Sequence, residues 1–533
     1  MSIRSRRAAA LACATATVTA LLVAVPGTAG SVGVQADGPV IPGWQEAAPD
    51  AVDVGKVLAP GIEHFRYQEN PVTDPAHPRY GMPRREFSVL RIDPAKGSLR
   101  IESSTGKAAG SAEIVRDQLN ANTKNLPIAG INGSYFMPEG LRKSDPAGTE
   151  ESVQSFGATV RDGVLLGAAC HGASRSSLVL QHGIPYITTV RTKLALKEKL
   201  PEGATATPEE MVLDDVNRNP GVPLACKREE GDGEKVDFVH SAGKKELAAF
   251  QDPTELVLFN DQYGLKTPAR NLIEDPKITA DDDEGFEVLI AADGTLSRPQ
   301  GWTAQRGGKV VPKGQYVLQA VGKERVDWLK ARLASGVKFD VEQTMTDTFG
   351  NRPLPLDESV DVVSGGADLF DDGVAQVPSV YVTTTNTDPE KSVELTDPLT
   401  GAKVRAALDE AKQPVFSSCA RAVKTVGKIS CQDSRTVVGV DDQGRTLFAT
   451  LTGPRDEADE AVFAGGFLVE LNAPLTAFGV MDAVNLDGGG STMMLLRDSD
   501  HPQNYQRHTG LTDATHREVF DTVYVGFGGQ LLG

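Results

Sequence analysis

Positive charge is scarce in this sequence of 533 residues. Lysine and arginine together number 54, against 72 aspartate and glutamate residues, which gives a formal net charge of −18 at pH 7. A protein of this charge repels nucleic acids and anionic membrane surfaces. We therefore expect no nucleic-acid partner, and an anionic substrate would have to be held by a local cluster of basic residues.

Long apolar runs are missing after the N-terminal region. Three arginines between residues 4 and 7 precede an apolar segment at 8–25, and small residues follow up to Ala29 and Ala36. This order is typical of a secretory signal peptide. No later stretch has the ~18 consecutive apolar residues of a membrane-spanning helix. We expect a signal peptide over 1–36, cleaved after Ala29 or Ala36, a secreted, extracellular protein and no stable membrane anchor.

Cysteine is also rare. Apart from Cys13 in the predicted signal peptide, the chain has Cys170, Cys226, Cys419 and Cys431. Export permits disulfides, and four cysteines allow three pairings. The pairing between sequence neighbours joins Cys170 to Cys226 and Cys419 to Cys431. A zinc site is the alternative, but there is no C-x-x-C pair and no histidine at a spacing that would complete one.

Several well-known catalytic motifs are absent. The sequence has no G-x-S-x-G, no G-x-x-x-x-G-K-[ST], no G-x-G-x-x-G between a strand and a helix, and no H-E-x-x-H. A serine-hydrolase elbow, the common nucleotide-binding folds and a zinc protease are therefore not supported. No metal or cofactor is predicted. The acidic residues Asp371 and Asp372 could hold calcium, but they lack EF-hand spacing, and a solvated turn is expected.

The patterning that is present favours an α+β fold with a mixed, mostly antiparallel sheet core and a few packed helices. Short apolar runs flank the turn pairs 162–163, 182–183, 293–294 and 372–373 and the turn 441–444, which predicts β-hairpins. Helices are expected in three stretches, each with its own start or stop signal: Ser111 as N-cap of 111–122, Gly336 after 324–335, and Pro474 as a break within 460–478.

The same survey predicts the domain organisation. Residues 37–85 read as an N-terminal tail or linker, because the first part is rich in proline, glycine and alanine. A single catalytic domain is expected over 86–527. Charged, weakly periodic stretches near 191–253 and 386–414 are predicted to be insertions that form loops or small lobes.

The strongest local signal lies at residues 485–492, which read Asn-Leu-Asp-Gly-Gly-Gly-Ser-Thr. An apolar strand ends at Asp487, and three glycines follow, which lets the backbone approach a ligand without a Cβ clash. The N–H groups of Gly488, Gly489 and Gly490 could form an anion-binding nest, and Ser491 and Thr492 add hydroxyl donors. A flexible turn is the plainer alternative.

Two further polar turns follow apolar strands. Residues 131–136 place Asn132 at a strand end, before Gly133, although an Asx turn would explain this pattern equally well. At 364–370, Gly365 and Gly366 again permit close approach to a ligand. Arg435 and Arg517 lie in strand-like surroundings, and the guanidinium group suits phosphate or carboxylate, although each could form an ordinary surface salt bridge.

Taken in order, these segments resemble the phosphodiester glycosidase family. The resemblance lies in 132–136 (Asn-Gly-Ser-Tyr-Phe), 365–369, 435–439 (Arg-Thr-Val-Val-Gly), 485–492 and the late Arg517. Ser134 departs from the glycine usual in the family, and Ala367-Asp368 stands where proline is common. The resemblance implies a phosphodiester glycosidase-like fold and hydrolysis of a sugar from a glycosyl phosphodiester at its anomeric carbon.

The resemblance also suggests roles for individual residues. Asp487 would activate water or stabilise the sugar cation, and Asn132 would orient water or a substrate hydroxyl. Arg435 and Arg517 would hold the phosphate, assisted by the glycine N–H groups. The second carboxylate is not assigned, with Asp368 and Glu287 as the only suggestions. Two alternatives remain open: a non-catalytic protein that binds cell-envelope polysaccharide, and a phosphodiesterase that cleaves a teichoic-acid-like polymer on phosphorus.

Overall fold

The computed structural model is described here for residues 38–47, 59–73, 75, 84–96, 98–122, 125–138, 152–170, 175–220, 235–239, 245–250, 254–268, 285–302, 306–376, 392–396, 403–408, 414–415, 433–453, 465–466, 468–497, 505–509 and 517–527. The predicted signal peptide and the cysteines at 226, 419 and 431 lie outside these residues. Cys170 is disulfide-bonded, and both predicted pairings stay predictions.

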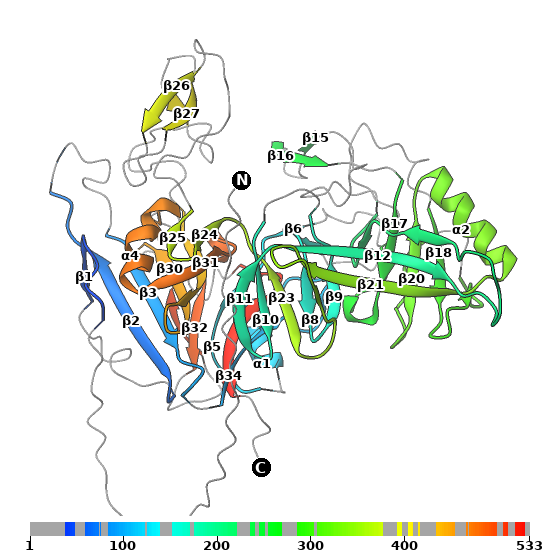
Figure 1. Cartoon of the computed structure of the whole chain (residues 1–533), viewed down its shortest axis with the longest axis horizontal. Helices are drawn as coiled ribbons and strands as arrows, with labels where there is room; N and C mark the ends of the chain where they lie inside the picture. Colours follow the sequence, from blue (N-terminus) through cyan, green and yellow to red (C-terminus); the bar gives the residue numbers. More distant parts are fainter. Residues whose placement is uncertain are drawn as a thin grey trace, which may run out of the picture. The chain divides into compact units, whose positions relative to one another are not determined.

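The largest sheet joins strands from the two ends of the chain. Blue β2 and β3 lie in the same sheet as orange β30 and β31 (Figure 1). All neighbouring strands in it are antiparallel. Its order is β1 (Trp44–Glu46), β2 (Ile62–Glu69), β3 (Glu86–Ile92), β30 (Thr446–Thr452), β29 (Arg435–Asp441), β31 (Val480–Asn485), β24 (Asp368–Asp371) and β25 (Val374–Ala375).

Two five-stranded antiparallel sheets share a hydrophobic core with the largest sheet. The order of the first is β33 (Tyr505–Thr509), β32 (Met494–Arg497), β5 (Pro127–Asn132), β34 (Thr522–Phe527) and β4 (Leu99–Ser104). The order of the second is β11 (Ile184–Thr188), β10 (Ser177–Gln181), β23 (Val360–Ser364), β8 (Thr159–Arg161) and β9 (Val164–Gly167).

Two more sheets surround another core, into which Leu329 of the longest helix packs. The first comprises β14 (Asp215–Val216), β17 (Leu256–Phe259), β20 (Tyr316–Ala320), β18 (Phe286–Ile290) and β19 (Leu296–Ser297). The second comprises β13 (Glu210–Val212), β12 (Val190–Glu198), β21 (Phe339–Asp347) and β22 (Arg352–Leu354). The β14–β17 pair is parallel, unlike the others described.

The remaining described strands form three small sheets: β6 (Phe136–Pro138) with β7 (Val153–Ser155), β15 (Lys235–Val239) with β16 (Lys245–Phe250), and β26 (Ser392–Thr396), β27 (Lys403–Leu408) and β28 (Pro414–Val415). The described helices are α1 (Val115–Ala121), α2 (Lys323–Ser335) and α4 (Asn472–Ala477), with the short 3-10 turns η1 (Asp261–Tyr263), η2 (Leu468–Leu471) and η3 (Gly489–Ser491). The described fold is mostly antiparallel β-structure with few helices, which confirms the predicted mostly antiparallel sheet core with a few helices.

Both faces of the largest sheet are buried. Successive side chains of a strand point to opposite faces, and on β3 Leu90 joins one core while Val89 joins the other. Val438 and Val437 divide in the same way on β29. Because both faces are buried, strands such as β3 and β29 carry apolar residues at consecutive positions instead of alternating with polar ones.

The predicted turns are confirmed in the structure. Antiparallel strand pairs flank the turns at 162–163, 182–183, 293–294, 372–373 and 441–444. Asp162, His182 and Asp372 all have positive φ and precede a glycine, as two-residue hairpins require. Helix α2 is also confirmed, since Gly336 ends it in the left-handed conformation.

The N-terminal tail prediction was wrong for the strand β2. Ile62, Phe65 and Tyr67 are buried in the core of the largest sheet. Their near-alternation with polar residues was a strand signal. The composition of the preceding residues obscured that signal, because it suggested a linker for the whole region.

The insertion prediction was also wrong for residues 191–216. Strand β12 pairs with β21 along its length, and Leu194 and Leu196 are core residues. The charged residues of this stretch lie on the outer face of a half-buried strand. By contrast, the strands β26 to β28 of the second predicted insertion pair only with one another among the described residues.

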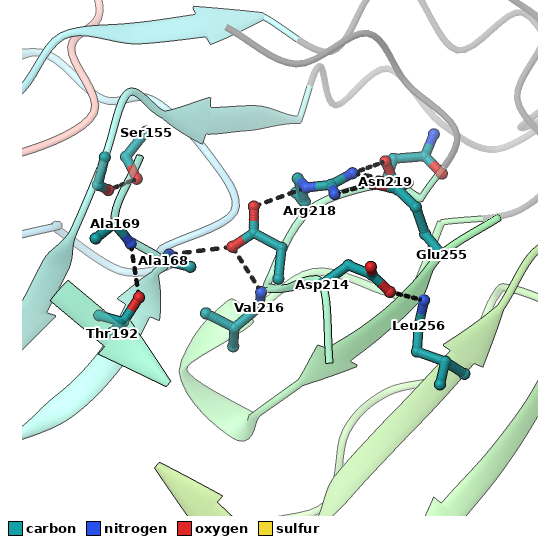
Figure 2. A network of polar contacts seen from close by, with 12 residues as sticks. Ser155, Ala168, Ala169, Thr192, Asp214, Val216, Arg218, Asn219, Glu255 and Leu256 are labelled. Carbon is teal, nitrogen blue, oxygen red and sulfur yellow. Dashed lines mark hydrogen bonds and ion pairs between the residues drawn. The ribbon is translucent and has the colours of Figure 1, made fainter. Parts of the chain in front are cut away.

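A buried network of charged residues stabilises the fold around β14, at the end of the 191–216 segment. The Arg218 guanidinium points toward Glu255 (Figure 2), and Arg218 Nη1 donates to Glu255 Oε2 at 3.0 Å. Arg218 Nε donates to Asp215 Oδ2 at 2.7 Å, and Asp215 Oδ1 accepts from Ala168 N at 3.0 Å. All three charged residues are buried. Because each charge has a partner, the network holds β14 and β17 to the turn after β9.

Two predicted helices are shorter than expected. Helix α1 starts at Val115 rather than after Ser111, whose hydroxyl instead donates to the Ala108 carbonyl at 3.3 Å. In the described part of 460–478, η2 precedes a six-residue helix whose first turn contains Pro474. A proline is tolerated there because its missing N–H has no helical partner in the first turn.

Candidate active site

The end of β31 brings Asp487 next to the start of β29. The two strands pair with Asn485 opposite Val437, and Leu486 N then donates to Thr436 O at 2.8 Å. The next contact in line joins Gly489 N to Ser434 O, also at 2.8 Å. Strand pairing therefore places Asp487 beside residues 433–435.

The glycines after Asp487 are required by close packing. A Cβ on Gly488 would lie 2.6 Å from the Ser434 carbonyl oxygen. Gly489 has a φ of +60°, and a Cβ there would lie 2.9 Å from Asp433 Oδ2. The Asp433 carboxylate thus rests against the backbone of the turn that carries Asp487.

The predicted role of these glycines in phosphate binding needs correction. Gly488 N donates to Asp487 Oδ1 at 2.9 Å, and Gly489 N donates to Ser434 O. Ser491 N and Thr492 N donate back to Gly488 O and Gly489 O, each at 3.1 Å. The N–H groups of Gly488 and Gly489 therefore have partners within the protein, and the turn orients the Asp487 carboxylate. The predicted contact of Gly490 N with an anion stays a prediction.

Asn132 lies at the end of β5 and is fully buried. Its Nδ2 donates to the Asp487 backbone carbonyl at 2.7 Å. Its Oδ1 accepts from Thr436 Oγ1 at 2.8 Å and from Met493 N at 3.1 Å. This differs from the predicted contact with water or substrate, because the amide is committed to protein groups. Asn132 is positioned to hold the turn that carries Asp487.

Tyr135 links two of the predicted motifs. Its hydroxyl accepts a hydrogen bond from Asn485 Nδ2, and its ring would be 2.8 Å from a Cβ on Gly366. A Cβ on Gly365 would lie 2.3 Å from Val484. The two glycines are therefore explained by packing between strands, and no described contact requires a ligand there.

Three arginines surround this cluster. Arg435 Nε donates to Gly466 O at 2.9 Å, and the exposed Arg517 lies 5.7 Å from the Phe136 ring centroid. Arg175, which the sequence analysis missed, lies 5.6 Å from the Tyr135 ring centroid. Both Arg435 and Arg517 lower the pKa of Asp433. A local positive cluster therefore exists on a strongly acidic protein.

Burial raises the pKa of Asp487 to about 6. The Ser491 hydroxyl, Arg517 and the Gly488 N–H oppose this rise, and the Asp433 charge adds to it. Although part of the Asp487 residue reaches solvent, its surroundings exclude enough water to penalise the charge. A carboxyl group with a pKa of about 6 can exchange a proton near neutral pH.

Asp433 is a further carboxyl group beside the turn that carries Asp487, and the sequence analysis did not name it. It is half-buried, and burial raises its pKa. Its position in the sequence, two residues before the start of β29, does not distinguish it from other aspartates of this acidic chain. Glu287 was the wrong suggestion, because its carboxylate accepts from Thr267 at 3.3 Å and Gln319 at 2.9 Å in a different sheet. Asp368 lies on β24 opposite Val484, and its role stays a suggestion.

Among the described residues, no group of three or more histidine, cysteine, aspartate or glutamate side chains is arranged to hold a metal ion. In the same part of the chain, no helix is both long and apolar enough to cross a membrane.

Part of the chain matches a known protein family. Residues 335–525 match the family model of phosphodiester glycosidases, so the resemblance seen in the sequence is confirmed for this range. The match includes Asp433, Arg435, Asp487 and Arg517, whereas Asn132 precedes it. No curated protein matches the sequence.

Solved structures support the fold. A predicted exported protein of Burkholderia pseudomallei is similar with a TM-score of 0.56 at 20% identity, covering 83% of this chain and 74% of that one. A Synechocystis protein gives 0.50 at 12% identity, covering 88% of this chain and 64% of that one. The catalytic domain of zebrafish N-acetylglucosamine-1-phosphodiester α-N-acetylglucosaminidase has a TM-score of only 0.31 at 12% identity. That alignment covers 91% of this chain and 87% of the zebrafish chain.

Proposed function

We propose that this protein is a secreted hydrolase that cleaves a sugar from a glycosyl-1-phosphodiester at the anomeric carbon. The observation that carries the proposal is the meeting of two carboxyl groups, Asp433 and Asp487, with Arg435 and Arg517. These groups lie within the range that matches phosphodiester glycosidases. Export is supported by the N-terminal sequence pattern and suits a cell-envelope polysaccharide or another extracellular substrate.

The chemistry of the leaving group suits this arrangement. Water attacks the anomeric carbon, the bond from that carbon to the phosphate oxygen breaks, and the electron pair stays on the phosphate. A phosphate monoester is already a stable anion, so it needs charge neutralisation more than a proton. Arg435 and Arg517 supply that neutralisation.

The two carboxyl groups divide the remaining tasks. Asp487, ionised above its pKa of about 6, accepts the proton of the attacking water or stabilises the oxocarbenium-like transition state. Asp433, whose pKa the charges of Arg435 and Arg517 lower, is the second carboxylate of the site. Asn132 and the glycine turn fix the direction of the Asp487 side chain.

Isotope incorporation tests the bond that breaks. The purified mature protein is incubated in ¹⁸O-water with methyl diesters of glucose-1-phosphate and N-acetylglucosamine-1-phosphate. Label in the released sugar supports anomeric cleavage. Label in the phosphate product instead indicates attack on phosphorus, the teichoic-acid-type alternative. Saturable binding without any turnover favours the polysaccharide-binding alternative.

Two variants accompany this assay. Asp487→Asn should lower kcat by about a hundredfold or more, because it removes a group that touches the reacting atoms. Asp441→Asn changes another buried carboxylate, on the opposite end of β29, where Asp441 Oδ2 accepts from Arg445 Nε at 2.6 Å. It should leave turnover per folded molecule unchanged. Near-normal turnover by a folded Asp487→Asn variant would remove Asp487 from the reaction.

A further inference from the structure

A tyrosine from the 132–136 motif contacts the strand that leads to Asp487. Tyr135 lies between β5 and β6 and is partly exposed. Its hydroxyl accepts a hydrogen bond from the side-chain amide of Asn485, the last residue of β31. Asn485 is 1% exposed and precedes Asp487 by two residues. The contact therefore lies at the entrance to the turn that carries the candidate catalytic carboxyl group.

Each member of this pair has one hydrogen-bonding group left over. Because Asn485 Nδ2 can only donate, the Tyr135 hydroxyl keeps its own proton, and within the described residues this proton has no acceptor. Asn485 Oδ1 is buried and has no hydrogen-bond partner in the same part of the chain. A buried polar atom without a partner is costly, and native structures rarely leave one. The pair thus offers one donor and one acceptor side by side.

This complement does not depend on which way round the Asn485 amide lies. With the amide reversed, Tyr135 donates to Asn485 Oδ1, so the tyrosine oxygen becomes the acceptor and Nδ2 becomes the donor. In both cases the fitting group is one that accepts and donates at a single atom. A sugar hydroxyl does both, whereas the free oxygens of a phosphodiester only accept.

Strand geometry places the pair on the face of the largest sheet that carries Arg435. Asn485 is paired with Val437, so their side chains lie on the same face. Arg435 precedes Val437 by two residues and therefore shares that face. Two residues of a strand span roughly 7 Å. A single hexose with its anomeric carbon at Asp487 can therefore reach the pair.

Packing holds the Tyr135 ring in place. A Cβ on Gly366 would lie 2.8 Å from Cε2 of the ring, and Phe156 N donates to Tyr135 O at 2.8 Å. The Arg175 guanidinium lies 5.6 Å from the centroid of the Tyr135 ring and 5.2 Å from that of Phe156. Because protein groups already fix the ring, little conformational freedom is lost when the hydroxyl binds a ligand.

We propose that Tyr135 and Asn485 form the sugar-recognition point of the site and bind one hydroxyl of the glycosyl group as both donor and acceptor. This inference rests on the proposed function, because it concerns the part of the substrate that the arginines do not hold. A site built to hydrogen-bond a hydroxyl discriminates strongly against an analogue that lacks it, since the groups of the site are then left unpaired. The pair therefore determines which sugar is accepted.

A cycle of one variant and a set of substrate analogues tests the assignment. The parent probe is the methyl diester of glucose-1-phosphate or N-acetylglucosamine-1-phosphate, whichever is turned over faster, and its monodeoxy analogues each lack one hydroxyl. Tyr135→Phe removes only the phenolic oxygen and should lower kcat/KM for the parent by about tenfold or more. For the analogue that lacks the bound hydroxyl, the same substitution should change kcat/KM by less than about twofold. An equal loss for the parent and every analogue indicates a purely structural role and overturns the inference.

Tyr505→Phe is the matched control. The Tyr505 hydroxyl also accepts from a side chain, Arg497 Nη2 at 3.1 Å, but it donates its proton to Pro127 O at 3.0 Å. Both of its hydrogen-bonding roles are filled by the protein. Its kcat/KM per folded molecule should therefore match that of wild type for every probe.

Binding measurements separate this inference from the proposed function. The Kd values of the parent and its analogues are measured by titration calorimetry for wild type and Tyr135→Phe. If wild type binds the probes but releases no sugar, the proposed function fails and the same cycle is judged from Kd. A loss of affinity in Tyr135→Phe that disappears for one analogue supports the pair. Equal losses for all probes, or no binding of any probe by folded wild type, overturn it.

Discussion

The side-chain amide of Asn132 donates a 2.7 Å hydrogen bond to the backbone carbonyl of Asp487. The two residues lie at the ends of strands in different sheets, β5 and β31. Since Asn132 also accepts from Thr436 and Met493, one buried amide joins three segments of the site. The geometry of the candidate catalytic carboxyl group thus depends on a residue that itself contacts only protein groups.

Replacing Asn132 should therefore damage both stability and turnover. Asn132→Ala leaves Thr436 Oγ1, Met493 N and the Asp487 carbonyl without their partner, at a cost of roughly 2–4 kcal/mol in the free energy of unfolding. Asn260→Ala is the matched control, because Asn260 is a buried asparagine that donates to Leu165 O at 2.8 Å. Denaturant unfolding should show a similar loss in the free energy of unfolding for both variants. The kcat of the folded fraction should fall only for Asn132→Ala.

Asp433→Asn should show whether the second carboxylate is catalytic. We expect kcat to fall by at least about tenfold. The ionisation of Asp487 should also move to lower pH, because Asp433 raises the Asp487 pKa. The measurement is the pH dependence of kcat/KM. A variant with wild-type kcat and an unshifted profile would contradict a role for Asp433.

Gly489→Ala should distort the site more than backbone strain alone would. Gly489 has a φ of +60° and a Cβ there would lie 2.9 Å from Asp433 Oδ2. Gly444 has a φ of +73°, and a Cβ there would have no atom within 4 Å, so Gly444→Ala isolates the strain, roughly 1 kcal/mol. The excess destabilisation of Gly489→Ala in urea unfolding measures the contact with Asp433. Equal losses for the two variants would contradict it.

Arg517→Met should weaken substrate binding. The exposed Arg517 faces both carboxyl groups and is proposed to hold the phosphate. We expect KM to rise about tenfold or more with a smaller change in kcat, and inhibition by inorganic phosphate to weaken in parallel. Arg445→Met, at a turn where the arginine pairs with Asp441, is the control. An unchanged KM would exclude Arg517 from phosphate binding.

The pH dependence of stability should have an unusual sign for aspartate. Burial raises the pKa of Asp361 to about 6, whereas an unfolded aspartate has a pKa near 3.9. The folded state therefore binds more protons between these values, and stability falls as the pH rises through them. Asp361→Asn should show a smaller drop in Tm between about pH 4 and about pH 7 than wild type. The same change in Tm for wild type and Asp361→Asn over this interval would contradict the raised pKa.

Much of the local structure could be predicted from the sequence. Hairpins such as that at Asp162 follow from turn residues that tolerate positive φ, and the end of α2 follows from Gly336. Such features depend on neighbours within a few residues. The family resemblance, too, is carried by short segments such as 485–492, where the order of residues is itself the signal.

The roles of individual site residues required the tertiary structure. Gly488 and Asn132 were predicted to contact a ligand, but their polar groups are committed to Asp487. Asp433 could not be recognised, because an aspartate near an arginine or a strand is common in any acidic sequence. What distinguishes it is burial and the charges that other strands bring near.

The sequence by itself thus determined the turns, the strand periodicity and the polar segments that resemble those of phosphodiester glycosidases, since these depend on local backbone preferences and residue order. Only the tertiary structure decided which carboxyl groups share one site and which of them are shielded from water. The physical reason is that pKa values and hydrogen-bond partners depend on contacts between segments hundreds of residues apart, such as Asn132 with Asp487 and Tyr135 with Asn485.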